Sequence, residues 1–295
     1  MLEVADKEMR KRAGIMVYAL LIVLIIVVVD LVISNSMIQV TSQELQFNNL
    51  PESFRGFKIL HITDLHSKSF GNKNEVLIKA INRQEPDLVV MTGDMVNSRD
   101  NDFTVLFDLC DRIAGNYPIY WVNGNHEQGL DQQHLEQIMG YLKAKDIPVL
   151  KNTAVRITRG QDYINLWGLE IAMRYYSRSI NGQHDYRFGA KQINELLPNV
   201  DEQELNILLT HNPVYFETYA NWGADLTLCG HMHGGMIRIP FLGGLLSPEV
   251  SFFPKYDAGL FAEDGRYMYV SRGVGNGVFP VRLFNRPEIA VITLR

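Results

Sequence analysis

The stretch LTLCGHMHGG at residues 226–235 combines a short apolar run, a glycine and two histidines. The apolar run is typical of a buried strand. His231 and His233 are separated by one residue, and side chains at that spacing on an extended chain point to the same face. Because many His-x-His pairs are ordinary surface residues, this pair needs support from the rest of the chain.

Four other motifs supply that support. Each follows a short hydrophobic run, so each is expected where a strand ends. Five of the eight histidines lie in these motifs or in residues 226–235. The motifs are Asp64-x-His66, Gly93-Asp94, Gly124-Asn-His-Glu127 and Thr210-His-Asn212.

The spacing of three of these polar residues predicts that they converge. Asp64, Asp94 and Asn125 are thirty and thirty-one residues apart, which is the length of one βαβ unit. Apolar runs at 57–63, 87–92 and 118–123 predict the strands, and helical periodicity at 74–83 and 103–113 predicts the crossover helices. Parallel strands joined in this way share one carboxyl edge, where open α/β sheets bind ligands. We therefore expect the three side chains to meet at that edge.

The remaining chain predicts one α/β (α+β) domain with two sheets and helices outside them. Residues 37–47 favour an edge strand, and 173–188 favour a loop over the site. The chain has no internal repeat or low-complexity linker that would indicate two separate domains. Further strands are expected at 149–150, 154–158, 163–168, 205–210, 225–229, 236–239, 267–271 and 289–294, and helices at 132–144, 190–197 and 213–221.

Residues 14–33 are almost all apolar and have about the length that crosses a hydrocarbon core as a helix. Basic residues precede this run, and none follows it before Arg55. The positive-inside rule then places residues 1–13 in the cytoplasm, 14–33 across the cell membrane as a single-pass anchor, and the rest outside. Residues 34–56 form a linker with an edge strand, and 57–295 a globular domain. A signal peptide cleaved near Ser34-Asn35-Ser36 is the alternative, but the length of the run favours an uncleaved anchor.

Bulk composition excludes several classes of protein. A hydrophobic content of 46% and a charged content of 21% indicate a folded chain and not a disordered one. The net charge of −5 gives no reason to expect a nucleic-acid partner. Cys110 and Cys229 are the only cysteines, so no disulfide framework is expected. Cys229 is interpreted as a small buried side chain and not as a metal ligand.

The candidate metal ligands form a mixed set of oxygen and imidazole donors, which suits manganese, iron or zinc better than calcium or magnesium. Seven donors are too many for one tetrahedral ion and suit two divalent ions, with manganese favoured. Such a pair can activate a bridging hydroxide and stabilise both the attacking and the leaving oxygens of a phosphoester. The seven are Asp64, His66, Asp94, Asn125, His211, His231 and His233.

In order and composition these motifs resemble the five-block signature of calcineurin-like metallophosphoesterases, and the resemblance covers about residues 57–295. It implies a four-layer αββα sandwich of two mixed β-sheets flanked by helices. It also implies that Asp94 is shared between the two ions and that His126 assists the leaving group or contacts phosphate. One ion would be held by Asp64, His66, Asp94 and His233, and the other by Asp94, Asn125, His211 and His231.

The segments 271–275, 280–282 and 286–288 resemble the membrane-anchored bacterial branch of that family. Arg272 and Arg282 lie in these segments. They are either phosphate-binding residues or ordinary solvated surface residues. His184, in the predicted loop over the site, is a further substrate-binding candidate. Glu127 is expected to support its own loop, and His61 to be a satisfied core residue.

The favoured function is hydrolysis of a phosphomonoester or phosphodiester at a dinuclear metal centre, on an envelope substrate such as a lipid-linked phosphate. A secreted nucleotidase is the alternative, with Tyr175 and Tyr176 as a clamp for a base. A non-catalytic metal-binding scaffold is disfavoured, because no ligand is missing. Phe241, Leu242, Leu245, Leu246 and 251–254 are either core residues, the favoured interpretation, or contacts to the bilayer. The oligomeric state is left open.

Overall fold

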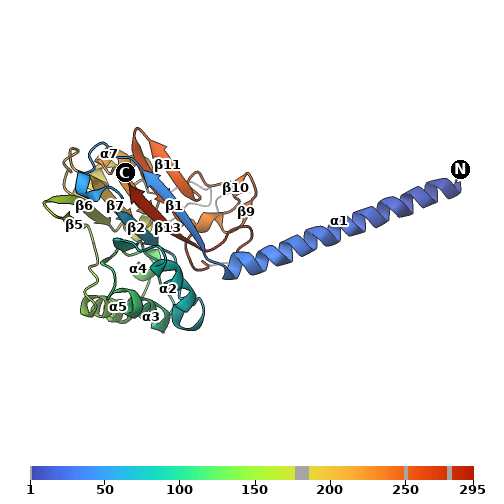
Figure 1. The fold of residues 1–295 in the computed structure, drawn as a ribbon, viewed down its shortest axis with the longest axis horizontal. Helices are drawn as coiled ribbons and strands as arrows, with labels where there is room; N and C mark the ends of the chain where they lie inside the picture. Colours follow the sequence, from blue (N-terminus) through green and yellow to red (C-terminus); the bar gives the residue numbers. More distant parts are fainter. Residues whose placement is uncertain (1, 177–185, 249–251, 278–280) are drawn as a thin grey trace.

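The structure is a computed structural model that describes residues 2–176, 186–248, 252–277 and 281–295 (Figure 1). Its first sheet is mixed and has the strand order β1-β13-β2-β3-β4. β2, β3 and β4 are parallel neighbours, and β13 is antiparallel to β2 and parallel to β1. The strands are β1 (Gln39–Leu45), β13 (Glu288–Leu294), β2 (Lys58–Ile62), β3 (Leu88–Met91) and β4 (Ile119–Trp121).

The second sheet has the order β11-β12-β8-β7-β6-β5. Its four central strands are parallel, and the two outer strands are antiparallel to their neighbours. The strands are β11 (Gly259–Glu263), β12 (Arg266–Val270), β8 (Leu226–Cys229), β7 (Asn206–Thr210), β6 (Asp162–Leu169) and β5 (Thr153–Arg159).

Side chains point alternately to the two faces of each strand, and this alternation produces the layers of the fold. Val89 and Met91 on β3 pack into a core cluster that includes apolar side chains of helices α2 (Glu75–Asn82), α3 (Thr104–Ile113) and α5 (Gln132–Ala144). Leu88 and Val90 point the other way, into a cluster shared with the second sheet. Helices α6 (Ala190–Leu196) and α7 (Phe216–Trp222) cover the far face of that sheet. The result is the expected four-layer αββα sandwich.

Several predicted elements differ in detail. The strand expected at 149–150 is a single bridge between Trp121 and Val149, and the strand expected at 236–239 shrinks to β9 (Arg238–Ile239). The short strand β10 (Gly243–Gly244) and β11 were not predicted. Within 173–188, the described part includes a 3-10 turn (Met173–Tyr175), and residues 177–185 lie outside the described residues.

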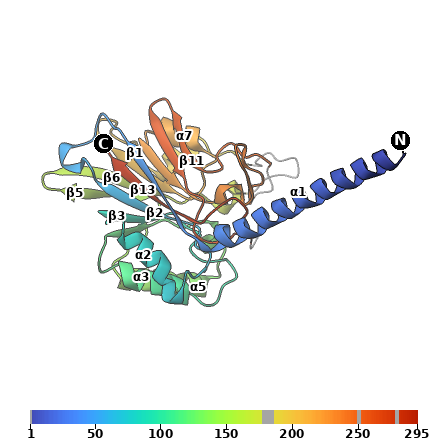
Figure 2. The same cartoon turned by 45° about the vertical axis from the view of Figure 1, so that its right-hand side comes forward.

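The N-terminal helix α1 (Leu2–Ser36) extends from the globular part, as Figures 1 and 2 show. Within the described chain it is long and apolar enough to cross a membrane, with a mean hydropathy of 3.2 in a window of which none is buried. Its last two turns contact the domain. Asp30 accepts a hydrogen bond from the backbone of Phe284 at 2.6 Å, and Asn35 donates to the backbone of Arg282 at 2.9 Å. The helix end is therefore fixed to the domain and is not a loose tether.

Candidate metal centre

The seven candidate ligands all lie just beyond the carboxyl ends of parallel strands. They come from both sheets, after β2, β3, β4, β7 and β8. Backbone hydrogen bonds join the loops, because Asp64 N–H donates to the Gly93 carbonyl at 3.0 Å and His66 N–H donates to the Asp94 carbonyl at 3.0 Å. The convergence of Asp64, Asp94 and Asn125 predicted from their spacing is therefore what the fold produces.

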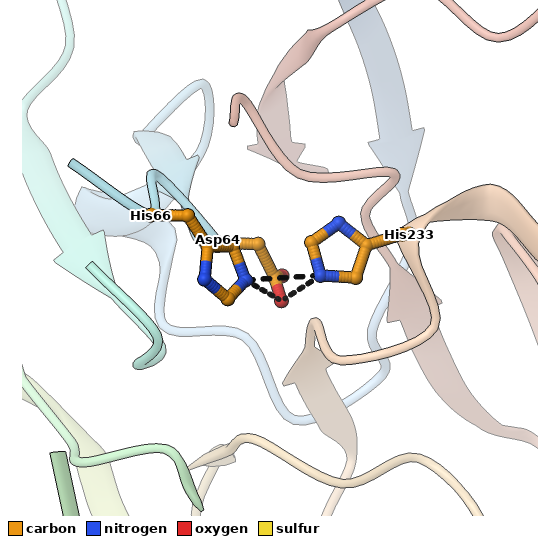
Figure 3. Close-up of side chains that lie close together, drawn as sticks. All are labelled: Asp64, His66 and His233. Carbon is orange, nitrogen blue, oxygen red and sulfur yellow. Dashed lines mark hydrogen bonds and ion pairs between the residues drawn. The ribbon is translucent and has the colours of Figure 1, made fainter. Parts of the chain in front are cut away.

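The ligand atoms gather in two neighbouring groups, Asp64–His66–His233 and Asp94–His211–His231, and a third group, His66–Asp94–His126, overlaps both; the atoms of each group lie within 4.8 Å of one another. In the first group, the His233 Nε2 atom lies 3.2 Å from Asp64 Oδ1 and 3.0 Å from His66 Nε2. Figure 3 shows these three side chains pointing toward a common centre. Two imidazole nitrogens and a carboxylate oxygen that face each other suit a shared cation.

Asp94 lies between the two groups. Its Oδ2 atom is 3.0 Å from His211 Nε2 and 3.9 Å from His66 Nε2. Its Oδ1 atom accepts a hydrogen bond from the His126 backbone at 2.8 Å. One carboxylate thus faces ligands of both groups.

The buried amide oxygen of Asn125 has no hydrogen-bond partner among the described residues. Burial of such an acceptor without a partner costs about 1–3 kcal/mol, so an unpaired oxygen here needs a compensating interaction. An amide oxygen is a common ligand for a divalent cation. The residues present therefore fit the metal ions that the resemblance implies.

The backbone at the site is strained. Asp64, His66, Asp94, His231 and His233 have φ angles of 53°, 47°, 52°, 70° and 49°. Residues other than glycine adopt this left-handed region at a cost of about 1–3 kcal/mol each. Five of the seven candidate ligands carry this cost, which indicates that their positions are set by function and not by local stability.

The glycines of two motifs allow close approach. A Cβ on Gly124 would lie 2.2 Å from Asp94 Oδ1, and a Cβ on Gly230 would lie 2.2 Å from Asp64 Oδ2. No other residue fits at these two places without displacing a candidate ligand.

Glu127 supports the loop that carries Asp94. Its buried carboxylate accepts hydrogen bonds from the backbone N–H groups of Asp94, Met95 and Gly124 at 2.8, 2.7 and 2.8 Å. Burial, together with the charge of Asp94, raises the pKa of Glu127 to about 7. The supporting role predicted for Glu127 is confirmed.

The electrostatics of the cluster favour a cation. Burial alone would raise the pKa of Asp94, but the imidazoles of His211, His126 and His66 outweigh burial and hold it well below its usual range. For His211, burial acts to lower the pKa, yet the charge and hydrogen bond of Asp94 raise it to about 9. A bound metal ion would displace the His211 proton, because an imidazole must be neutral to coordinate.

Polar partners behind the ligands fix which imidazole nitrogen faces the cluster. His66 Nδ1 lies 2.9 Å from Asn97 Oδ1, and His211 Nδ1 lies 2.7 Å from the Thr92 carbonyl. Both histidines therefore direct Nε2 inward, and such partners orient and tune metal ligands. Asn97 was not predicted from the sequence, because it lies in no motif and reaches His66 only through the loop after β3.

His126 lies at the mouth of the cluster with a partly exposed ring. Its Nδ1 atom accepts a hydrogen bond from the Ser98 backbone at 3.1 Å, so in the neutral ring the proton lies on Nε2. That Nε2 atom is 4.0 Å from Asp94 Oδ2. Burial is the main cause that lowers the pKa of His126.

A cavity of about 210 Å³ opens over the cluster. Tyr176 forms part of its wall, with its ring 5.1 Å from the ring of His231. Tyr175 instead packs in the core against Phe188 and Tyr215, so the two tyrosines do not act as a paired clamp. The cavity is lined by Asp94, Asn125, His126, Tyr176, His231, His233, Pro248 and Gly277.

The basic residues proposed for phosphate are engaged elsewhere. The buried guanidinium of Arg282 donates to the backbone carbonyls of Arg272, Gly273 and Gly275. Arg272 donates to the carboxylate of Glu288 at 3.0 Å. Both arginines thus hold the segment behind the ligands together, and their candidate role in binding phosphate stays a prediction. His184 lies outside the described residues.

His61 and Cys229 have the core positions expected of them. His61 is fully buried, and its Nε2 atom lies 2.7 Å from Thr92 Oγ1. Burial lowers the pKa of His61 to about 3, so the ring is neutral. Cys229 is buried on β8 and belongs to none of the ligand groups found among the described residues.

Comparison with known proteins agrees with this geometry. The family model for calcineurin-like phosphoesterases matches residues 57–235. The chain is 32% identical over 245 residues to Phosphodiesterase YaeI of Escherichia coli, which covers 81% of this chain and 82% of that protein. It is 27% identical over 265 residues to the metallophosphoesterase YkuE of Bacillus subtilis, which covers 88% of this chain and 86% of that protein.

The chain is also similar to a transmembrane protein with a metallophosphoesterase domain from Bos taurus. The two are 27% identical over 268 residues, which covers 87% of this chain and 57% of that protein. The residues matched by the family model make up more than half of this chain and contain every candidate metal ligand. The chain is therefore a hydrolase that belongs to the calcineurin-like phosphoesterase family.

Proposed function

We propose that this protein hydrolyses a phosphodiester or phosphomonoester at the cell envelope, with two divalent metal ions as cofactors. The observation that carries the proposal is the convergence of seven ligand-type side chains beside His126 in one buried cluster. Buried carboxylates and imidazoles in this number are costly unless they are paired or bind metal. Manganese is the favoured ion, with iron and zinc as the alternatives.

The division of ligands expected from the resemblance is supported by the two groups Asp64–His66–His233 and Asp94–His211–His231. Asp94 would bridge the ions, because its Oδ2 atom faces His211 of one group and His66 of the other. Asn125 would complete the second set with its unpaired buried oxygen. The first ion would be held by Asp64, His66, Asp94 and His233, and the second by Asp94, Asn125, His211 and His231.

When bound, two such ions supply a hydroxide nucleophile near neutral pH and stabilise charge on the phosphoryl oxygens. The chain contributes the rest. His126 presents Nε2–H to the cavity, where the neutral ring can donate a hydrogen bond to the leaving oxygen or to a phosphate oxygen. Tyr176 and Pro248 narrow the cavity, so the phosphate is oriented and part of the water is excluded.

The position of the domain favours an envelope substrate outside the cytoplasm. Helix α1 is apolar and exposed, and the basic residues before it favour an N-terminus in the cytoplasm. A lipid-linked phosphate would then be within reach. The similarity to Phosphodiesterase YaeI of Escherichia coli supports a diester over a monoester. A secreted nucleotidase is less favoured because Tyr175 is part of the core, and a non-catalytic scaffold because no ligand is missing.

A substrate screen tests this function. The full-length protein, purified in detergent and stripped of metal, would be loaded with Mn²⁺, Zn²⁺ or Mg²⁺ and given bis(p-nitrophenyl) phosphate or p-nitrophenyl phosphate. We expect turnover of the diester, greatest with Mn²⁺, that disappears on chelation and returns when metal is restored. Full metal loading without turnover of either compound would instead favour a binding scaffold.

A further inference from the structure

Large apolar side chains are exposed on the part of the domain next to the metal centre. We call Ile237, Phe241, Leu242, Phe252, Phe253 and Val281 the apolar rim. Phe241 is fully exposed, and Leu242 and Phe252 are each 68% exposed. The core interpretation favoured from the sequence is therefore wrong for Phe241, Leu242, Phe252 and Phe253. The reason is local, since strands β9 and β10 are two residues long and leave the turn between them outside the core.

Backbone contacts hold the rim together as one small substructure. Phe241 and Leu242 occupy the turn between β9 and β10. Leu245 N–H donates to the Ile237 carbonyl at 2.8 Å, and Phe253 N–H donates to the Leu245 carbonyl at 3.0 Å. The exposed side chains are thus neighbours and not scattered surface residues. Contiguous apolar patches on a folded protein mark sites that contact a partner or a membrane.

The end of helix α1 is bonded to the segment 281–285, at the edge of this rim. Asn35 makes two hydrogen bonds to the backbone of Arg282, at 2.9 and 3.1 Å. Ser34 Oγ accepts from the backbone of Asn285 at 3.2 Å. On its other side the same segment bonds to β9, because Arg238 N–H donates to the Leu283 carbonyl at 3.0 Å. The orientation of the rim relative to the helix is therefore fixed.

The hydrogen bond between Phe284 and Asp30 fixes the position of this substructure along the axis of α1. Asp30 lies inside the span 14–33 that is expected to cross the membrane, and it accepts a hydrogen bond from Phe284. With residues 14–33 in the bilayer, the segment 281–285 would be held at the membrane surface. Figure 1 shows β9 and β10 on the side of the domain from which α1 leaves.

We propose that the apolar rim inserts into the bilayer leaflet from which α1 emerges. The occupant is lipid because the rim lies beside a helix that itself faces lipid, and because phenylalanine and leucine side chains insert favourably at the boundary of headgroups and acyl chains. The proposal rests on the membrane insertion of α1 that forms part of the proposed function. It adds that the domain itself contacts the membrane in one orientation.

This contact bears on the substrate. Pro248 and Gly277 line the cavity over the metal centre, and they belong to the same two stretches of chain that carry Phe253 and Val281. The cavity therefore opens beside the rim. A phosphoester with long acyl or prenyl chains would reach the metal centre with its phosphate while its chains stay in the leaflet.

Tryptophan quenching tests the contact without any need for turnover. Full-length Phe241→Trp protein would be reconstituted in phosphatidylcholine and phosphatidylglycerol vesicles whose acyl chains carry bromine. The three native tryptophans, at positions 121, 167 and 222, lie outside the rim and give the same background in every variant. Leu24→Trp in the middle of α1 reports insertion of the anchor. Leu260→Trp on β11, which lies away from α1 in Figures 1 and 2, is the matched control.

We expect brominated lipid to reduce the added fluorescence of Phe241→Trp and Leu24→Trp, with little loss for Leu260→Trp. Phe252→Trp provides a second reporter should Phe241→Trp fail to fold. Quenching of Leu24→Trp alone would overturn the rim proposal and leave the anchor intact, as expected if the rim instead binds a protein or a second copy of the chain. An absence of quenching at every position would contradict both the membrane insertion of α1 and that of the rim. The metal chemistry is tested separately by the substrate screen.

Discussion

The side-chain amide of Asn285 donates a hydrogen bond to the backbone carbonyl of His233 at 2.7 Å. The same amide donates to the Met236 carbonyl at 2.9 Å, and the Asn285 backbone donates to Ser34 Oγ at 3.2 Å. Asn285 thus joins the end of the anchor helix to the loop of a candidate metal ligand. The left-handed backbone of His233 is held in place by this contact.

We predict that Asn285→Ala weakens metal binding. Loss of a residue that supports a ligand typically costs about 10–100-fold in metal affinity. Titration of the metal-free protein with Mn²⁺ measures this directly. The matched control is Asn116→Ala, whose exposed side chain bonds only to the Arg112 carbonyl among the described residues. Equal affinity in the two variants would mean that His233 needs no support from Asn285.

Glu127→Gln is predicted to lower stability. Four backbone N–H groups donate to the Glu127 carboxylate. A glutamine amide would offer them only one acceptor oxygen, and its NH2 group would face some of these donors. Each buried donor left without a partner costs about 1–3 kcal/mol. Thermal unfolding should show a clear fall in Tm, together with loss of metal. Glu136→Gln on the exposed face of α5 controls for the change of charge, and an unchanged Tm for Glu127→Gln would contradict the supporting role.

His126→Ala is predicted to lose turnover while keeping metal. The ring lies at the mouth of the cluster, and its Nε2 atom is 4.0 Å from Asp94, so it is placed to contact substrate. Loss of one hydrogen-bond donor to charge that develops in the transition state typically costs about 10²–10³-fold in rate. The loss should be larger for substrates with poor leaving groups. His134→Ala on α5 is the control, and a rate near that of the natural protein on a poor leaving group would rule out assistance to the leaving oxygen by His126.

The architecture was predictable because its signals are local and repeated. Each strand that carries a ligand is a short apolar run, and the thirty-residue spacing of Asp64, Asp94 and Asn125 fixes parallel neighbours. The strands, the crossover helices and the meeting of ligands at one sheet edge followed from these patterns. Glu127 was also interpreted correctly, since it lies three residues after Gly124 at the start of the short helix α4 (Asn125–Gln128).

Long-range contacts were not predictable. The partners Asn97 and Asn285 belong to no motif, and Asn285 reaches His233 from 52 residues away. Arg282 was a candidate for binding phosphate or for surface solvation because it is basic and lies in the C-terminal segments, whereas its guanidinium is buried among backbone carbonyls. The exposure of Phe241 depends on how a very short hairpin packs, which the hydrophobicity of the residues does not determine.

The orientation of the anchor gives another prediction. Replacement of Arg10, Lys11 and Arg12 by glutamate should weaken or scramble the topology, because basic residues before the apolar run hold the N-terminus in the cytoplasm. Protease treatment of intact cells or spheroplasts should digest the domain of the natural protein and leave a protected N-terminal fragment. Arg55→Glu, beyond the helix, is the control. Protection of the whole natural chain until lysis would place the domain in the cytoplasm.

Asp94 is proposed to bridge two metal ions in a hydrolytic centre. Its Oδ2 atom faces His211 and His66, which belong to different ligand groups. Asp94→Asn removes a negative charge that both ions would need. Elemental analysis combined with turnover of bis(p-nitrophenyl) phosphate is the most direct measurement. We predict two equivalents of metal in the natural protein and a joint loss of metal and turnover in Asp94→Asn, whereas two full equivalents with normal turnover in that variant would contradict the bridge.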